Sequence, residues 1–175
     1  KGAVPIIDHA DVRRMLLEMK CLTEGCRALI YSAVKMQDES TTLKVAGKKE
    51  DAEENEEYMG LFIPLVKSFV SDSAVRIASL AVQVYGGHGY LRDHPVEQYL
   101  RDARIFPIYE GTNGIQALDL VGRKLGSGGG KFIGRFVKEC NDFAEGLKKR
   151  GGYDQEVPIF LKAVAGMNTA VGKYL

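Results

Sequence analysis

Apolar side chains recur at steps of three and four residues along most of the chain, which is the spacing of an α-helix with one buried face. The first such stretch runs from about His9 to Glu39, and Asp8 can cap its start. A second begins near Tyr58 or Pro64 and reaches Tyr85. Pro64 suits a first helical turn, because a missing N–H costs little there. The pattern predicts two long helices.

The stretch between them, Ser40–Glu57, is crowded with lysine, glutamate and aspartate and has few apolar side chains. Charge runs of this kind are typical of solvated segments. We therefore expect an exposed loop or a frayed turn, and we assign it no chemistry.

Shorter helical patterns follow. Two consecutive glycines end the second helix, a short helix is expected over Pro95–Ala103, and another, capped by Thr112 or Asn113, extends to Leu125. Gly126–Gly130 is a flexible joint. Beyond it the pattern predicts two more helices, Phe132–Leu147 and Pro158–Leu175.

No alternating pattern long enough for a strand is present, so the predicted fold class is all-α. We expect an up-and-down four-helix-type bundle with an extra C-terminal helical hairpin. The expected domains are residues 1–126 and 127–175, joined by the glycine-rich linker.

The amino-acid composition limits the classes of partner and site that the chain can have. The 24 Lys and Arg residues against 23 Asp and Glu leave a net charge of +1 without a basic stripe, which argues against nucleic acid. No apolar run approaches the roughly 20 residues that span a bilayer. Cys21, Cys26 and Cys140 lack the paired spacing of a metal site and are interpreted as reduced core residues. We expect a soluble intracellular protein.

Glu110 is the carboxylate with the most suggestive surroundings. The apolar stretch Ile105–Tyr109 precedes it and Gly111 leaves space beside it, which predicts a half-buried side chain. Burial raises the pKa of a carboxyl group towards the range needed by a general base. The alternative is a glutamate that only interacts with the dipole of the following helix. The spacing of residues around Glu110 does not decide between a general base and a contact with the helix dipole.

Gly86, Gly87 and Gly89 form the other notable cluster. They either end a helix or expose backbone N–H groups to a polar ligand, and the residues around them do not decide between the two. His88 and His94 lie nearby, but no further Cys or His supplies a third ligand, so no metal site is expected.

The phrases VQVYGGHGYLRDHPVEQYLRDARI and IYEGTNGIQ resemble two signatures of the C-terminal helical domain of the acyl-CoA dehydrogenases, a flavoprotein family. The resemblance covers residues 9–125, and the tail resembles an extension found in a larger-subunit branch. It implies α,β-desaturation of an acyl-CoA thioester, with Glu110 as the base that removes the α-proton. Its backbone N–H would help hold the thioester carbonyl.

The same resemblance implies further site residues. Gln83, Gly86 and Gly87 match the stretch that contacts FAD, usually that of a neighbouring subunit. Thr112 matches a contact to the flavin nucleotide. Tyr109 and Gly111 would flank the acyl cleft, binding substrate. Gly114 stands where several members of the family carry glutamine, so one hydrogen bond to the cofactor is in question.

The family's other two domains are not matched, and Lys1 is not an initiating methionine, so we expect a piece of a longer protein that is inactive alone. The implied partners are acyl-CoA, an electron-transfer flavoprotein and further copies of the chain in a homo-oligomer. Location would be cytoplasmic in a bacterium, or the mitochondrial matrix in a eukaryote. Two alternatives remain, an acyl-CoA oxidase and a non-catalytic helical oligomerisation module.

Overall fold

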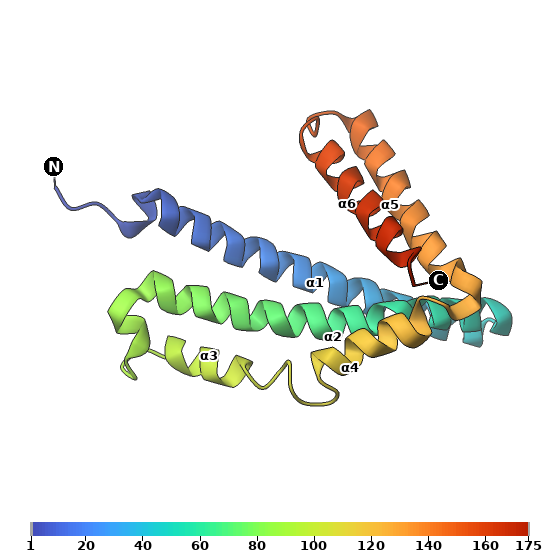
Figure 1. The fold of residues 1–175 in the computed structure, drawn as a ribbon, viewed down its shortest axis with the longest axis horizontal. Helices are drawn as coiled ribbons and strands as arrows, with labels where there is room; N and C mark the ends of the chain where they lie inside the picture. Colours follow the sequence, from blue (N-terminus) through green and yellow to red (C-terminus); the bar gives the residue numbers. More distant parts are fainter. Residues whose placement is uncertain (1, 175) are drawn as a thin grey trace. The chain divides into compact units, whose positions relative to one another are not determined.

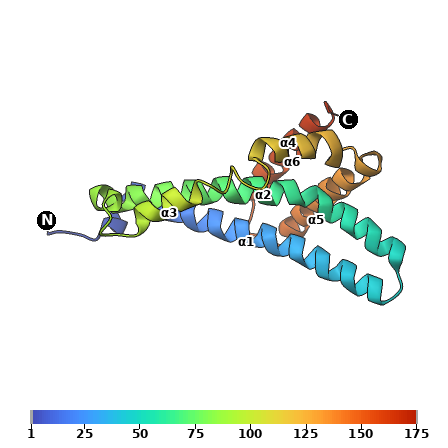
Figure 2. The same ribbon diagram turned by 90° about the horizontal axis from the view of Figure 1, so that it is seen from below.

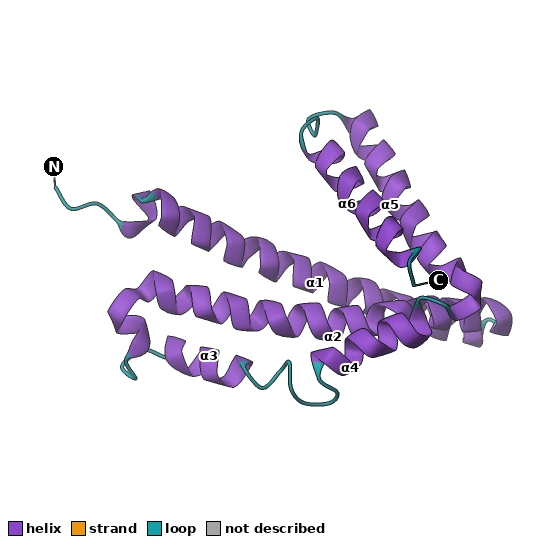
Figure 3. Cartoon of the chain, viewed as in Figure 1, coloured by secondary structure: helices purple, strands orange, loops and turns teal. Residues whose placement is uncertain are grey.

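Two long helices dominate the first part of the computed structural model, which describes residues 2–174. Helix α1 spans Ala10–Val45 and helix α2 spans Lys49–Tyr85. They lie side by side as a hairpin in both Figure 1 and Figure 2. Gly47, with φ of 76°, forms the short turn between them. The described residues contain helices, turns and loops but no strand (Figure 3), which confirms the predicted all-α class.

The prediction of a loop over Ser40–Glu57 is wrong, because nearly the whole stretch is helical. Ser40, Ala52 and Tyr58 are fully buried and Asn55 is 8% exposed. These four side chains bring the two helices together, while the glutamates and lysines, which are good helix formers, occupy the outer face. The charge run marks the solvated side of a helix and not a break in it.

Pro64 lies inside α2, not in its first turn as predicted. A proline in a helix interior costs about 3 kcal/mol, because it cannot donate the hydrogen bond to the residue four positions earlier. Tyr58, Leu61 and Phe62 are buried in the preceding turns, and each buried side chain of this size contributes about 1.5–3 kcal/mol. Packing therefore outweighs the local cost of the proline.

The segment after α2 returns along the same helix. A 3₁₀ turn, η2, covers Gly86–Tyr90, and α3 spans Val96–Ala103. Figure 1 shows α3 running beside α2. A loop then leads to α4, Asn113–Asp119, which continues through a π-helical turn at Leu120–Lys124. The short helix predicted over Pro95–Ala103 is confirmed.

The chain divides into two compact units, residues 1–117 and 118–175. In the second unit, α5 (Lys131–Arg150) and α6 (Glu156–Val171) form a hairpin. Its interior holds Ala144 and Val157, and the rings of Phe143 and Phe160 lie 5.8 Å apart. The predicted end of the last helix at Leu175, like Lys1, lies outside the described residues.

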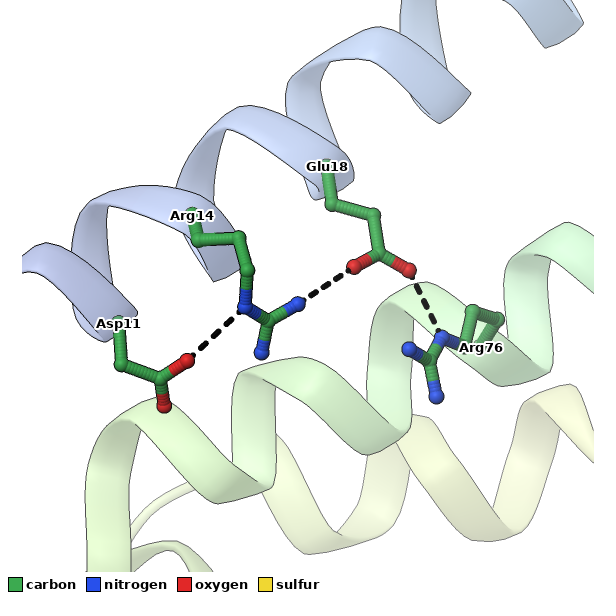
Figure 4. A network of polar contacts seen from close by, with 4 residues as sticks. All are labelled: Asp11, Arg14, Glu18 and Arg76. Atoms are coloured by element: carbon green, nitrogen blue, oxygen red, sulfur yellow. Dashed lines mark hydrogen bonds and ion pairs between the residues drawn. The ribbon is translucent and has the colours of Figure 1, made fainter.

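An ion-pair network links α1 to α2 within the first unit (Figure 4). Arg14 Nε lies 2.9 Å from Asp11 Oδ1, and Arg14 Nη1 lies 3.0 Å from Glu18 Oε2. Glu18 Oε1 also accepts a hydrogen bond of 2.9 Å from Arg76 Nε on α2. Glu18 thus bridges its own helix and the neighbouring one.

The cysteines are free; Cys26 is buried and Cys140 is partly buried. Cys21 is exposed, so its interpretation as a core residue is wrong; its position falls on the outer face of α1. Burial raises the pKa of the Cys140 thiol above its usual value. No helix among the described residues is both long and apolar enough to cross a membrane.

Candidate functional site

Glu110 lies in the loop between α3 and α4, at an open cleft of about 370 Å³ against the side of α2. The wall from α2 consists of Val66, Lys67, Val70, Ser71 and Ala74, and the loop side of Phe106, Tyr109 and Glu110. The lining is mostly apolar, and the rings of Phe106 and Tyr109 lie 6.2 Å apart. The cleft therefore combines an apolar surface with one carboxylate.

The Glu110 side chain is exposed, which contradicts the predicted half-burial. The apolar residues of the preceding stretch are exposed as well: Ile105 by 49%, Ile108 by 51% and Tyr109 by 48%. Phe106 and Tyr109 line the cleft beside the carboxylate, but the stretch leaves the Glu110 side chain exposed.

The backbone at Glu110 has an unusual conformation. Its φ is +50°, and among the described residues no other non-glycine has a positive φ. Gly111 follows with φ of +84°. A non-glycine residue in the left-handed region costs roughly 1–2 kcal/mol, and such strain persists only where the surroundings hold it in place. The surroundings therefore hold the Glu110 backbone in this conformation against its local energetic cost.

Gly111 is the residue that this turn requires. Its φ favours glycine, and a Cβ built there would lie 2.9 Å from Gln116 Nε2. Thr112 caps α4, since its Oγ1 accepts a hydrogen bond of 3.2 Å from Ile115 N. Of the two predicted capping residues, Thr112 fills the role.

Asn113, the other predicted capping residue, bonds through its side chain to α2, and its position in the sequence did not reveal this role. Its side chain contacts α2: Oδ1 accepts a hydrogen bond of 2.9 Å from Lys67 Nζ, and Nδ2 donates one of 2.8 Å to Asp72 Oδ1. Nδ2 also lies 3.0 Å from Ser71 Oγ. Lys67, Ser71 and Asp72 are functional candidates that pattern reasoning missed, because their partner is more than forty positions away.

Gln83, Gly86 and Gly87 lie elsewhere, at the C-terminal end of α2. They do not line the Glu110 cleft. Ala74, the last α2 residue of that cleft, precedes Gln83 by nine positions, or about 14 Å along the helix. Within the described chain, the structure unites Tyr109 and Glu110 in one cleft but separates them from the glycine turn.

The glycine turn is open on its outer side. Gly86 has φ of +61°, and a Cβ added at Gly86 or Gly87 would meet no atom within 4 Å. Gly89 is different, since its Cβ would lie 2.7 Å from Val82 O and from Tyr85 Cβ. Gly89 thus closes the turn against α2, and the neighbouring glycines leave backbone accessible.

The two histidines near this turn lie together, with ring centroids of His88 and His94 6.1 Å apart. Tyr85 lies 5.6 Å from His94. No group of three or more potential metal ligands occurs among the described residues. The cluster is an aromatic contact at the end of α2.

Residues 1–125 match the family model described as acyl-CoA dehydrogenase, C-terminal domain. The chain belongs to the acyl-CoA dehydrogenase family. The cleft carboxylate and the glycine turn both lie within the matched residues.

Relatives in the acyl-CoA dehydrogenase family cover most of the chain. It is 47% identical over 152 residues to the 3-methylmercaptopropionyl-CoA dehydrogenase of Ruegeria pomeroyi, covering 87% of this chain and 25% of the relative. It is 37% identical over 169 residues to a butyryl-CoA dehydrogenase of Syntrophomonas wolfei, covering 97% and 27%. The chain thus spans about a quarter of the length of these relatives.

Similar solved structures include the following two. One is described as an electron transferring flavoprotein of Acidaminococcus fermentans, with a TM-score of 0.52 and 31% identity over 69% of this chain and 27% of that one. The other, "Bd2924 apo-form", has a TM-score of 0.65 over 99% of this chain and 36% of that one. At 21% identity, the second likeness concerns the fold alone.

Proposed function

We propose that the full-length protein is an FAD-dependent acyl-CoA dehydrogenase, in which Glu110 removes the α-proton of an acyl-CoA thioester during α,β-desaturation. The observation that carries this proposal is the position of Glu110. Its carboxylate stands at a mainly apolar cleft on a loop held in a left-handed conformation. Strained backbone of this kind is concentrated at active sites.

The cleft suits an acyl chain on one side and a proton acceptor on the other. Val66, Val70 and Ala74 give α2 an apolar surface, which favours burial of methylene groups. Tyr109 and Gly111 flank the base. The Glu110 carboxylate accepts the proton, and its own N–H polarises the thioester carbonyl, which makes the neighbouring α-proton more acidic. Bound substrate also displaces water from the carboxylate.

Gln83, Gly86, Gly87 and Thr112 are the proposed contacts to FAD. The glycines fit this role because their outer side is open to an approaching group. The Thr112 hydroxyl accepts its hydrogen bond from the backbone, so its proton remains available to an oxygen of a cofactor. When bound, the flavin supplies the acceptor for the hydride that leaves the β-carbon.

We also propose that the domains divide between residues 126 and 127. The full-length protein is proposed to form a homo-oligomer, to pass electrons to an electron-transfer flavoprotein and to lie in the cytoplasm. The dehydrogenase names of the relatives favour this activity over an oxidase. The 175-residue chain alone is expected to be inactive, because it spans only about a quarter of the length of the dehydrogenases that it matches.

The test is exchange of the α-protons of a bound acyl-CoA with solvent deuterium in the full-length flavoprotein, followed by mass spectrometry. Glu110→Gln removes the base but keeps the size of the side chain, so exchange should fall by on the order of a hundredfold or more. Glu24→Gln, at an exposed position of α1, is the matched control and should exchange normally. Wild-type exchange in Glu110→Gln contradicts the proposal.

A further inference from the structure

The side chain of Asn113 connects the loop that carries Glu110 to Lys67, Ser71 and Asp72, which lie on two successive turns of α2. Lys67 Nζ donates to its Oδ1, and its Nδ2 donates to Asp72 Oδ1 and lies 3.0 Å from Ser71 Oγ. Ser71 in turn donates its own proton to Ser68 O at 3.1 Å. The amide group is thus held from several sides.

The chemistry of these partners fixes the orientation of the amide. An ammonium group can only donate and an ionised carboxylate can only accept. The amide oxygen must therefore face Lys67 and the amide nitrogen must face Asp72. If the amide were reversed, its NH₂ group would face the Lys67 ammonium, which is also a donor. Its oxygen would then face the Asp72 carboxylate, which is also an acceptor. The Asn113 amide therefore lies between the Lys67 cation and the Asp72 anion, with its oxygen towards Lys67 and its nitrogen towards Asp72.

The backbone of the same residue closes the loop. Asn113 N donates a hydrogen bond of 3.0 Å to Pro107 O, so residues 107 and 113 are tied across the segment that contains Glu110. Inside this closed segment are the two consecutive residues with positive φ, Glu110 and Gly111. A strained turn needs such external restraint, since it would otherwise relax to a more favourable conformation.

We propose that Asn113 is the positioning residue for Glu110: its amide, bound between Lys67 and Asp72, holds the loop on α2 so that the base faces the cleft. Asn113 does not itself contact the reacting atoms in this role. The inference rests on the proposed function of Glu110 as the base. Misplacement of a catalytic group by about 1 Å can cost on the order of a hundredfold in rate.

The experiment uses full-length flavin-loaded protein with three variants, Asn113→Asp, Asp72→Asn and the double variant Asn113→Asp/Asp72→Asn. Asn113→Asp places a carboxylate against Asp72, and repulsion should loosen the loop. We expect α-proton exchange and kcat to fall about tenfold to a hundredfold, with KM nearly unchanged. The double variant restores an amide facing a carboxylate in exchanged positions, and its rate should return to within about threefold of the wild type.

Asn141→Asp is the matched control, because Asn141 lies exposed on α5, where its Nδ2 donates a hydrogen bond of 3.0 Å to Val137 O. It should keep the wild-type rate. Thermal unfolding and flavin content are measured for every variant. If Asn113→Asp does not retain flavin, Asn113→Ala takes its place, with the same expected loss in kcat at unchanged KM.

Glu110→Gln is included to separate the hypothesis that Glu110 is the base from the hypothesis that Asn113 positions it. Normal exchange in Glu110→Gln overturns the base itself. Loss of exchange in Glu110→Gln together with wild-type rates in the Asn113 variants overturns only the positioning role. A loss in Asn113→Asp that the double variant does not restore also overturns it, because the amide-to-carboxylate contact would then not be the cause.

Discussion

Asn55 on α2 donates a hydrogen bond of 2.9 Å from its Nδ2 to the hydroxyl of Ser40 on α1, in the buried interface near the turn of the hairpin. The same Nδ2 donates to Met36 O at 2.8 Å. Ser40 is fully buried and Asn55 nearly so. This polar contact holds together the ends of two helices whose outer faces are densely charged.

Replacing Asn55 by alanine removes both of these hydrogen bonds. The buried Ser40 hydroxyl then loses one partner and a small cavity remains, so the free energy of unfolding should fall by about 1–3 kcal/mol. Urea unfolding measures the change. Asn141→Ala, which removes a comparable bond from an exposed helix surface, should stay within about 0.5 kcal/mol of the wild type. Equal effects of the two variants would contradict the buried role of Asn55.

Gly89 and Gly25 should respond to alanine with opposite signs. A Cβ at Gly89 would lie 2.7 Å from backbone Val82 O, so Gly89→Ala forces the turn away from α2 and should destabilise the protein by about 1–3 kcal/mol. Gly25 lies inside α1 with open space around it, so Gly25→Ala should stabilise by about 0.5–1 kcal/mol. Thermal unfolding of both variants tests this, and a stabilising Gly89→Ala would count against the tight turn.

The contribution of Glu18 should depend on pH. The hydrogen bond from Arg76, followed by the charges of Arg76 and Arg14, lowers the pKa of Glu18 below its usual value of 4.5. A carboxylate whose folded-state pKa is lowered adds stability above the unfolded pKa and loses it as pH falls through the folded value. Glu18→Gln should therefore lower the melting temperature at pH 7 and have little effect near pH 3.

The comparison at each pH between wild type and Glu18→Gln isolates this carboxylate. Because the pair is exposed, added salt should also reduce the difference at pH 7. A difference that stays the same from pH 7 to pH 3 would show that the charge of Glu18 is not its source.

The backbone strain at Glu110 can be measured directly. With φ of +50°, Glu110→Gly can adopt the left-handed conformation freely, whereas Glu110→Ala cannot. We expect Glu110→Gly to be more stable than Glu110→Ala by about 1 kcal/mol in urea unfolding, with both lacking α-proton exchange. A more stable Glu110→Ala would mean that the loop carries no such strain in solution.

Several features could be predicted from the sequence because they depend on residues that are close together along the chain. Helical periodicity located the long apolar faces, and Pro95–Ala103 appeared as a separate short helix. Thr112 was recognised as one of two possible caps. The charge run of Ser40–Glu57 misled the interpretation, because the few buried positions in it matter only when α1 and α2 pack against each other.

The sequence by itself determined the all-α class, the family and the identity of the cleft glutamate, since these reside in periodicity and in short contiguous phrases. Only the tertiary structure decided that Pro64 is accommodated inside a helix, that Glu110 is exposed and strained, and that Asn113 is bound between Lys67 and Asp72. The physical reason is that these properties arise from contacts between residues far apart in the chain, whose energies outweigh local preference.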